Sequence, residues 1–290
     1  MACSLISAGI NVVLDWVFIF PLGWGVKGAA IATSISVVIG GLIAVGYLLL
    51  YARFLRLYPI KWSRKSMRLF IRNIGYQCRI GSSALLAEAT LATLMFMGNH
   101  LFMHYLGEHG VGAFGIACYY TPFVFMVGNA IAQSAQPIIS YNFGAGCRQR
   151  VQKTIRIALL TAVLCGAAVT SLFVCIPHLL VGLFISPNDP TFAIATSGFP
   201  YYAAGFIFFI LNLTTIGYYQ SLERVGPATL LALLRGFFFL IPAFLLLPRW
   251  LDTPGIWLAL SCSELLTTLC SLAFYLFRTC CVRKQRCARG

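Results

Sequence analysis

The sequence predicts an all-α membrane protein with eight transmembrane helices. Of its 290 residues, 60% are apolar and only 10% are charged, whereas an ordinary soluble domain carries about 25% charged residues. So few charged side chains cannot cover the surface of a soluble protein of this size. A cytosolic enzyme, a disordered chain and a secreted disulfide scaffold are therefore excluded, and the mean hydropathy of +0.86 agrees.

Eight apolar runs are long enough to cross a bilayer, which takes about 20 helical residues. The basic residues cluster in the gaps between these runs and so mark where each helix ends. The third to fifth runs are the longest, and we expect them to tilt or to extend beyond the bilayer. In chain order, the predicted helices occupy roughly residues 3–20, 28–52, 72–105, 111–141, 152–184, 191–219, 227–247 and 255–277.

The basic residues also predict the orientation of these helices. The net charge is +14, and almost all of the Lys and Arg residues lie in the gaps after helices two, four, six and eight. The opposite gaps hold only Lys27 and Arg249. Because loops rich in Lys and Arg stay in the cytoplasm, we expect both chain ends there and interpret the charge as an orientation signal. The bases on that side are Arg53, Arg56, Lys61, Arg64, Lys65, Arg68, Arg72, Arg79, Arg148, Arg150, Lys153, Arg156, Arg224, Arg278, Arg283, Lys284, Arg286 and Arg289.

An internal repeat predicts the domain organisation. Residues 25–36 (GVKGAAIATSIS) and 252–263 (DTPGIWLALSCS) each open a helix from the outer side, and repeated halves are common in secondary transporters. Helices one and two then correspond to helices seven and eight. We expect residues 1–53 to be the last two helices of an N-terminal lobe and 54–71 a basic cytoplasmic linker. Residues 72–290 form a six-helix C-terminal lobe with a basic tail, and four further helices, roughly 160 residues, are expected before the chain.

Four stretches resemble the multidrug and toxic compound extrusion (MATE) family, in its order and spacing. The bacterial branch typified by the staphylococcal multidrug exporter is the most similar. The resemblance implies a two-lobed transporter of twelve helices in the bacterial cytoplasmic (inner) membrane. The stretches are 11–20 (NVVLDWVFIF, with GWGVKGAAIATSIS after it), 80–94 (IGSSALLAEATLATL), 136–146 (QPIISYNFGAG) and 217–248, which begins GYYQSLERVGP.

The resemblance implies secondary active multidrug efflux, in which small cationic or amphipathic compounds leave the cell in exchange for H⁺ or Na⁺. No phosphate-binding glycine loop, GxSxG or HExxH motif occurs in the sequence. We therefore expect no enzymatic activity, no catalytic or metal site, and no cofactor beyond the coupling ion. The expected partners are the drugs and the lipid bilayer, without nucleic acid, and the expected state is a monomer.

Glu88 is the predicted coupling residue. It lies about 16 residues, or roughly 24 Å, into the third helix, where burial disfavours the charged form of a carboxylate. Members of the Na⁺-driven branch carry a functional Glu in a similar context, here LLAEATLA. That branch pairs it with an Asp in the tenth helix, but no acid occurs between Asp189 and Glu223, so the coupling ion is not assigned. The alternative is a protonated Glu88 bonded to a neighbouring helix.

The fourth helix carries a stripe of aromatic and amide side chains at helical spacing. Flat aromatic rings and adaptable Met side chains suit apolar cations, so we expect the stripe to line a substrate cavity. The alternative is a seam in the lobe core, with the amides bonding between helices. The stripe comprises Tyr119, Phe123, Met126, Asn129 and Gln133, and continues to Gln136.

Arg235 and Glu264 are charged residues within the seventh and eighth helices. Charges inside a membrane are costly and usually pair. Because a short hairpin joins these helices, we expect the two side chains to form an intramembrane charge pair, with direct contact to substrate as the alternative.

Two other functions stay open at this point. A flippase for lipid-linked oligosaccharide of the same superfamily would need Arg or Lys in its central cavity, since its cargo is anionic. The other is a membrane scaffold without transport activity, which an efflux assay showing no ion-coupled flux by the full-length protein would favour.

Overall fold

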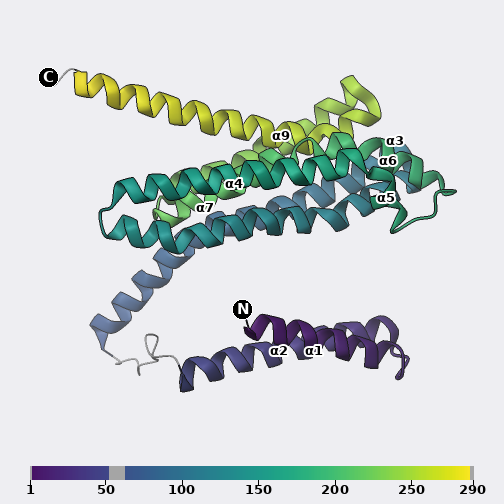
Figure 1. Cartoon of the computed structure of the whole chain (residues 1–290), viewed down its shortest axis with the longest axis horizontal. Coiled ribbons are helices and arrows are strands. Elements are labelled where there is room, and N and C mark those ends of the chain that lie inside the picture. Colours follow the sequence, from purple (N-terminus) through teal and green to yellow (C-terminus); the bar gives the residue numbers. More distant parts are fainter. Residues whose placement is uncertain (1, 52–62, 288–290) are drawn as a thin grey trace. The chain divides into compact units, whose positions relative to one another are not determined.

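The computed structural model describes residues 2–51 and 63–287, and the side chains of residues 3–51 and 63–276. Within those ranges the chain is helical apart from its turns and contains no strand. It divides into two compact units, residues 1–71 and 72–290 (Figure 1). Residues 54–62 of the predicted linker lie outside the described residues, as do Arg53, Arg56, Lys61, Arg289 and the side chains of Arg278, Arg283, Lys284 and Arg286.

The first unit is a hairpin of two apolar helices, α1 (Ala2–Ile19) and α2 (Gly25–Leu50). The Ser7 hydroxyl on α1 donates to the carbonyl of Ser36 on α2 over 2.8 Å. Nearer the turn, the rings of Phe18 and Trp24 pack 5.2 Å apart. Most large apolar side chains of this unit are exposed, as expected for helices that meet lipid rather than water.

The long helix α3 (Arg64–Gly144) enters the second unit at Arg72 and is two helices joined at a sharp break. A straight helix of that length would measure about 120 Å, several times the thickness of the bilayer core. Gly107 interrupts it with φ 64° and ψ −156°, a conformation that a residue without Cβ adopts at little cost. The halves then pack together, since the rings of Phe102 and Phe114 stack 4.7 Å apart.

The next expected helices are also interrupted. The expected helix 152–184 is split into α4 (Arg148–Cys175) and α5 (Pro177–Gly182), because a proline cannot continue the hydrogen bonding of the helix before it. The expected helix 191–219 is split into α6 (Pro190–Ala203) and α7 (Phe206–Ser221), which are bent by 45°.

The last expected helices contain a π-helical turn. They comprise α8 (Val225–Leu233), the π-helix η1 (Leu234–Phe238) and α9 (Leu240–Cys287). Asp252, with φ 51° and ψ −131°, breaks α9 in the gap expected between the seventh and eighth helices.

By length and composition, four of the described helices can cross a membrane, or five if α6 and α7 form one bent span. Two of the four are α3 and the stretch Val225–Leu276, and each of these contains a break. The helices are those of a multi-pass membrane protein, and the expected number of eight spans stays a prediction.

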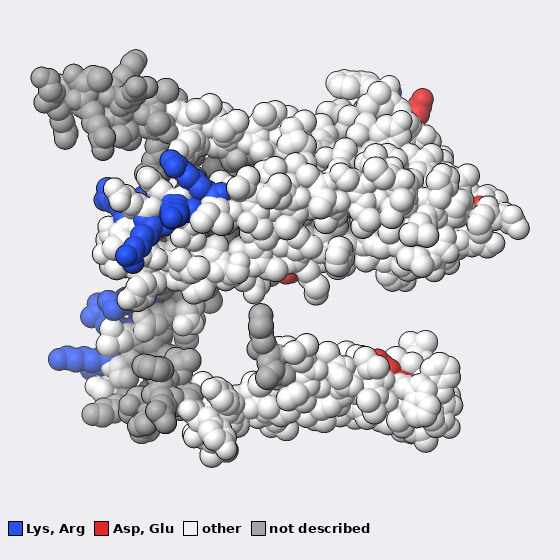
Figure 2. All heavy atoms as spheres, viewed as in Figure 1, with Lys and Arg blue, Asp and Glu red and all other residues white. Residues whose placement is uncertain are grey.

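The second unit has a buried aromatic core and one end that is rich in basic side chains. Aromatic side chains form its buried core, where Trp257 meets Phe102, Phe114 and Tyr202. On the face shown in Figure 2, most of the visible Lys and Arg side chains of this unit gather at the end away from the Asp252 break. This end contains the turn between α3 and α4 and the turn between α7 and α8.

Candidate functional site

A polar groove runs along the second unit between the two halves of α3 and α7. It consists of three adjoining cavities of about 430, 460 and 480 Å³. Glu88, Phe125, Asn129 and Gln133 line both the first and the second cavity. The first and third cavities share Ala84, Gln136 and Gln220, so that the groove is continuous from Leu91 toward Ser140 and Ser221 at the basic end.

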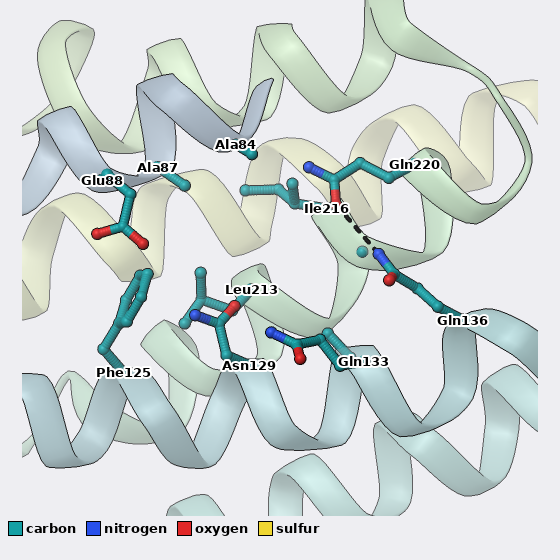
Figure 3. A pocket seen from close by; sticks show the side chains of 12 residues that line it. Ala84, Ala87, Glu88, Phe125, Asn129, Gln133, Gln136, Leu213, Ile216 and Gln220 are labelled. Carbon is teal, nitrogen blue, oxygen red and sulfur yellow. Dashed lines mark hydrogen bonds between the residues drawn. The ribbon is translucent and has the colours of Figure 1, made fainter. Parts of the chain in front are cut away.

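Glu88 provides the only acidic side chain among the residues that line these cavities. It projects from the first half of α3 toward Phe125 and Asn129 on the second half (Figure 3). Its side chain is exposed on the open side of the groove. The burial expected for this carboxylate is therefore not supplied by the unit in which it lies.

Amide side chains line the wall opposite Glu88. Asn129, Gln133 and Gln136 follow at helical spacing on the second half of α3, and residues three or four apart share a helix face. The amide of Gln136 donates to the Gln220 oxygen on α7 over 3.3 Å (Figure 3). Gln220 in turn donates to the Ser83 hydroxyl over 2.9 Å. This chain of hydrogen bonds connects three helical segments across the groove.

Small residues hold α7 against α3 at the groove floor. A Cβ on Gly217 would lie 2.7 Å from the Cβ of Ala132, so the two backbones approach as closely as glycine allows. Contacts between small residues drive helix association in membranes. Because this contact sets the rotation of α7, it also places Gln220 in the groove.

Only some of the predicted cavity residues line the groove. Met126, Asn129 and Gln133 line the groove. Tyr119 and Phe123 are exposed and are not among the residues that line these three cavities. The Tyr119 ring stacks instead on Phe184, with 5.6 Å between centroids.

The sequence did not predict that Phe125 and Gln220 would line the groove. Phe125 lies one turn before Asn129, so extending the amide face backwards would have found it. Gln220 had no such signal, because its position depends on the packing of α7 against α3.

Arg235 and Glu264 form an ion pair inside the second unit, and neither residue lines the groove. Both side chains are fully buried, and Nη2 of Arg235 lies 2.7 Å from Oε1 of Glu264. Asn212 on α7 donates to Oε2 over 2.7 Å. The guanidinium carbon lies 4.4 Å from the centroid of the Phe209 ring. One nitrogen of Arg235, Nη1, is buried without a partner among the described atoms.

The groove offers one carboxylate, several amide oxygens, an aromatic ring and a Met sulfur. Carboxylates and ring faces attract cations. Within the described part of the chain, no group of three or more His, Cys, Asp or Glu is placed to hold a metal ion. A groove that offers these groups can bind a cation or a proton.

Comparison with known proteins places the chain in a family. The sequence profile of the MatE family matches residues 84–245, which include Glu88, the amide wall and Gln220. The multidrug export protein MepA of Staphylococcus saprophyticus is 24% identical over 273 residues, covering 94% of this chain and 58% of the relative. MepA of Staphylococcus aureus is 25% identical over 288 residues, covering 96% and 60%. The chain thus spans about 60% of the length of these relatives.

Solved structures share the fold. An outward-facing multidrug resistance MATE family transporter of the MOP superfamily matches with a TM-score of 0.83 and 18% identity, over 98% of this chain and 62% of its own. A MOP superfamily transporter from Pyrococcus furiosus, whose description reports a binding pocket of reverse polarity and suggests a different function, matches equally well at 0.83 and 18%, over 96% and 61%. Together with the match over more than half of the chain, these findings confirm the resemblance predicted from the sequence: the chain belongs to the MatE family of MATE transporters.

Proposed function

We propose that this chain takes part in secondary active multidrug efflux, moving small cationic or amphipathic compounds out of the cell against an inward flow of H⁺ or Na⁺. The single observation that supports this most is the position of Glu88 in a continuous groove with Phe125, Met126 and Asn129. The coupling ion and the drug would both bind this one carboxylate, so that only one of them can be bound at a time. Exclusive binding is what an antiporter requires.

The charge of the groove favours cationic cargo over lipid-linked oligosaccharide. None of the residues that line the three cavities is Lys or Arg. Arg235, the base that a flippase would need in its cavity, is buried against Glu264. The fold alone does not determine the cargo. The Pyrococcus furiosus transporter has a similar fold, yet the reverse polarity of its binding pocket suggests a different function for it.

We place the transporter in the bacterial cytoplasmic membrane as a monomer, with its basic end in the cytoplasm. The Lys and Arg side chains that gather at one end of the second unit support this orientation (Figure 2). Four bases lie in the first part of α4: Arg148, Arg150, Lys153 and Arg156.

Dye efflux from a drug-sensitive bacterial host tests the proposal. The chain would be expressed alone and also joined behind the N-terminal part of MepA of Staphylococcus aureus. A fluorescent organic cation such as ethidium should be expelled by at least one of these forms. Glu88→Gln, which keeps the shape and removes the charge, should lower efflux to the level of cells without the protein.

The matched control is Glu223→Gln, which removes an exposed acid outside the groove. It should leave efflux unchanged at equal amounts of protein in the membrane. Wild-type efflux by Glu88→Gln would overturn the assignment of Glu88, and no efflux by either form of the chain would contradict the transport proposal. Efflux from vesicles under an imposed H⁺ or Na⁺ gradient then identifies the coupling ion.

A further inference from the structure

A second groove, of about 410 Å³, lies toward the basic end of the second unit between α7, α8 and α9. It shares no lining residue with the polar groove. Leu230 and Phe274 on its rim are 53% and 50% exposed, so it opens to the surroundings of the unit. The groove is lined by Tyr219, Pro227, Leu230, Leu231, Leu234, Cys270, Ser271 and Phe274.

The interior of this groove is hydrocarbon in character. The Ser271 hydroxyl already donates to the carbonyl of Thr268 over 2.9 Å, so it offers its occupant little polarity. The leucines, Pro227 and Phe274 supply the remaining surface. An alkyl chain gains free energy from such a surface with each methylene that it buries.

One end of the groove adjoins a positive charge. Tyr219 and Pro227 flank the turn that holds Arg224, and the Arg224 amide donates to the Tyr219 carbonyl over 2.9 Å. Arg224 is exposed and forms no ion pair among the described residues. Its neighbour Glu223, at φ 58°, likewise forms no ion pair among the described residues. Among the side chains that the structure describes, Arg224 is therefore a free positive charge at this end of the groove.

We propose that this groove binds an anionic phospholipid. One acyl chain lies along Leu230, Leu234 and Phe274, and the phosphate is held by Arg224, whose planar guanidinium binds phosphate oxygens in pairs. Tyr219 is suited to the boundary between chain and headgroup, because its ring is apolar and its hydroxyl is polar. The site would hold lipid at the turn that joins α7, with Gln220, to α8.

Lipid retention by the purified full chain tests this proposal. The protein would be reconstituted in vesicles of phosphatidylcholine and phosphatidylglycerol, extracted in detergent and analysed for bound lipid by native mass spectrometry. We expect phosphatidylglycerol to be retained in preference to phosphatidylcholine. Arg224→Gln should lower its retention about five-fold, the equivalent of about 1 kcal/mol for one basic residue at an anionic surface.

Two matched pairs separate this site from general attraction. Arg150→Gln removes an exposed arginine from the same end of the unit and should change retention little. Ser271→Phe fills the groove and should displace the lipid, whereas Leu269→Phe, at an exposed position that does not line it, should not. Arg224 is exposed, so Arg224→Gln tests the proposal even where Ser271→Phe fails to fold.

Three results would overturn the proposal. Equal retention of both lipids would show that the site does not recognise the anionic headgroup. An effect of Arg150→Gln as large as that of Arg224→Gln would show diffuse attraction to the basic end. A chain that retains neither lipid and runs as a dimer would assign the groove to a second copy.

Discussion

Removing one partner of the buried pair between Arg235 and Glu264 should destabilise the second unit strongly. Both side chains are fully buried, and Glu264 accepts hydrogen bonds from Nε of Arg235 at 3.0 Å, from Nη2 at 2.7 Å and from Asn212 at 2.7 Å. Glu264→Leu leaves a buried guanidinium without its ion-pair partner, over the ring of Phe209. Breaking a buried pair in this way typically costs about 3–5 kcal/mol.

The double replacement should cost much less than either single one. In the variant with Arg235→Met and Glu264→Leu no charge is left buried, and Asn212 keeps the carbonyl of Glu264 as an acceptor. Replacement of a buried pair by apolar residues of similar volume is often neutral or stabilising. The free energies of unfolding should therefore be strongly non-additive, with a coupling of several kcal/mol.

Equilibrium unfolding in mixed micelles measures these free energies, with fluorescence of the buried Trp257 as the signal. Glu108→Leu, at an exposed acid beside the Gly107 break, is the control and should stay within about 0.5 kcal/mol of the parent. Additive losses in the double variant would refute the reasoning. A double variant that is stable but transports nothing would assign the pair a direct role with substrate.

Two further substitutions test the packing and the acid stability of the same unit. Gly198→Ala should lower the free energy of unfolding by about 1–3 kcal/mol, because its Cβ would overlap the indole of Trp257. The control Gly115→Ala meets open space and should be close to neutral. Equal effects of the two substitutions would contradict the packing described. Asp189 accepts a hydrogen bond from the Thr191 amide over 2.8 Å, and hydrogen bonding from Thr191 holds the pKa of its carboxyl below the ordinary 3.8. Its contribution to stability is thus complete above pH 3.8 and is lost as the pH falls through the lowered value. Thermal unfolding as a function of pH should show Asp189→Asn less stable than the parent at neutral pH, with the difference vanishing in acid, and a difference that persists in acid would refute this.

The sequence was sufficient for the features that depend on residue type along one helix. The breaks at Gly107 and Asp252 fall in gaps that the apolar runs left between them. The approach of Arg235 to Glu264 followed from counting residues along a hairpin, since an isolated charge in a membrane needs a partner. Asn129 and Gln133 were found because amides at helical spacing form a face.

Features that depend on contacts between distant segments could not be predicted in this way. The bend between α6 and α7 occurs at Gly205, where α9 presses against the backbone through Ser261. Gln220 enters the groove because Gly217 meets Ala132. Neither contact has a signature within a short window of sequence, because each joins residues that are dozens of positions apart.

The π-helix η1 has a consequence for comparing the two segments that the predicted internal repeat pairs. A π turn accommodates one residue more than an α turn of the same rise, whereas α1, which the repeat pairs with this region, is α-helical from Ala2 to Ile19. Suppose that the two halves descend from one duplicated segment. A gap-free alignment that pairs the correct residues after Phe238 will then be wrong by one position before Leu234. Searches for internal symmetry in such proteins should therefore allow a single-residue gap at this turn, or they will underestimate how closely the halves are related.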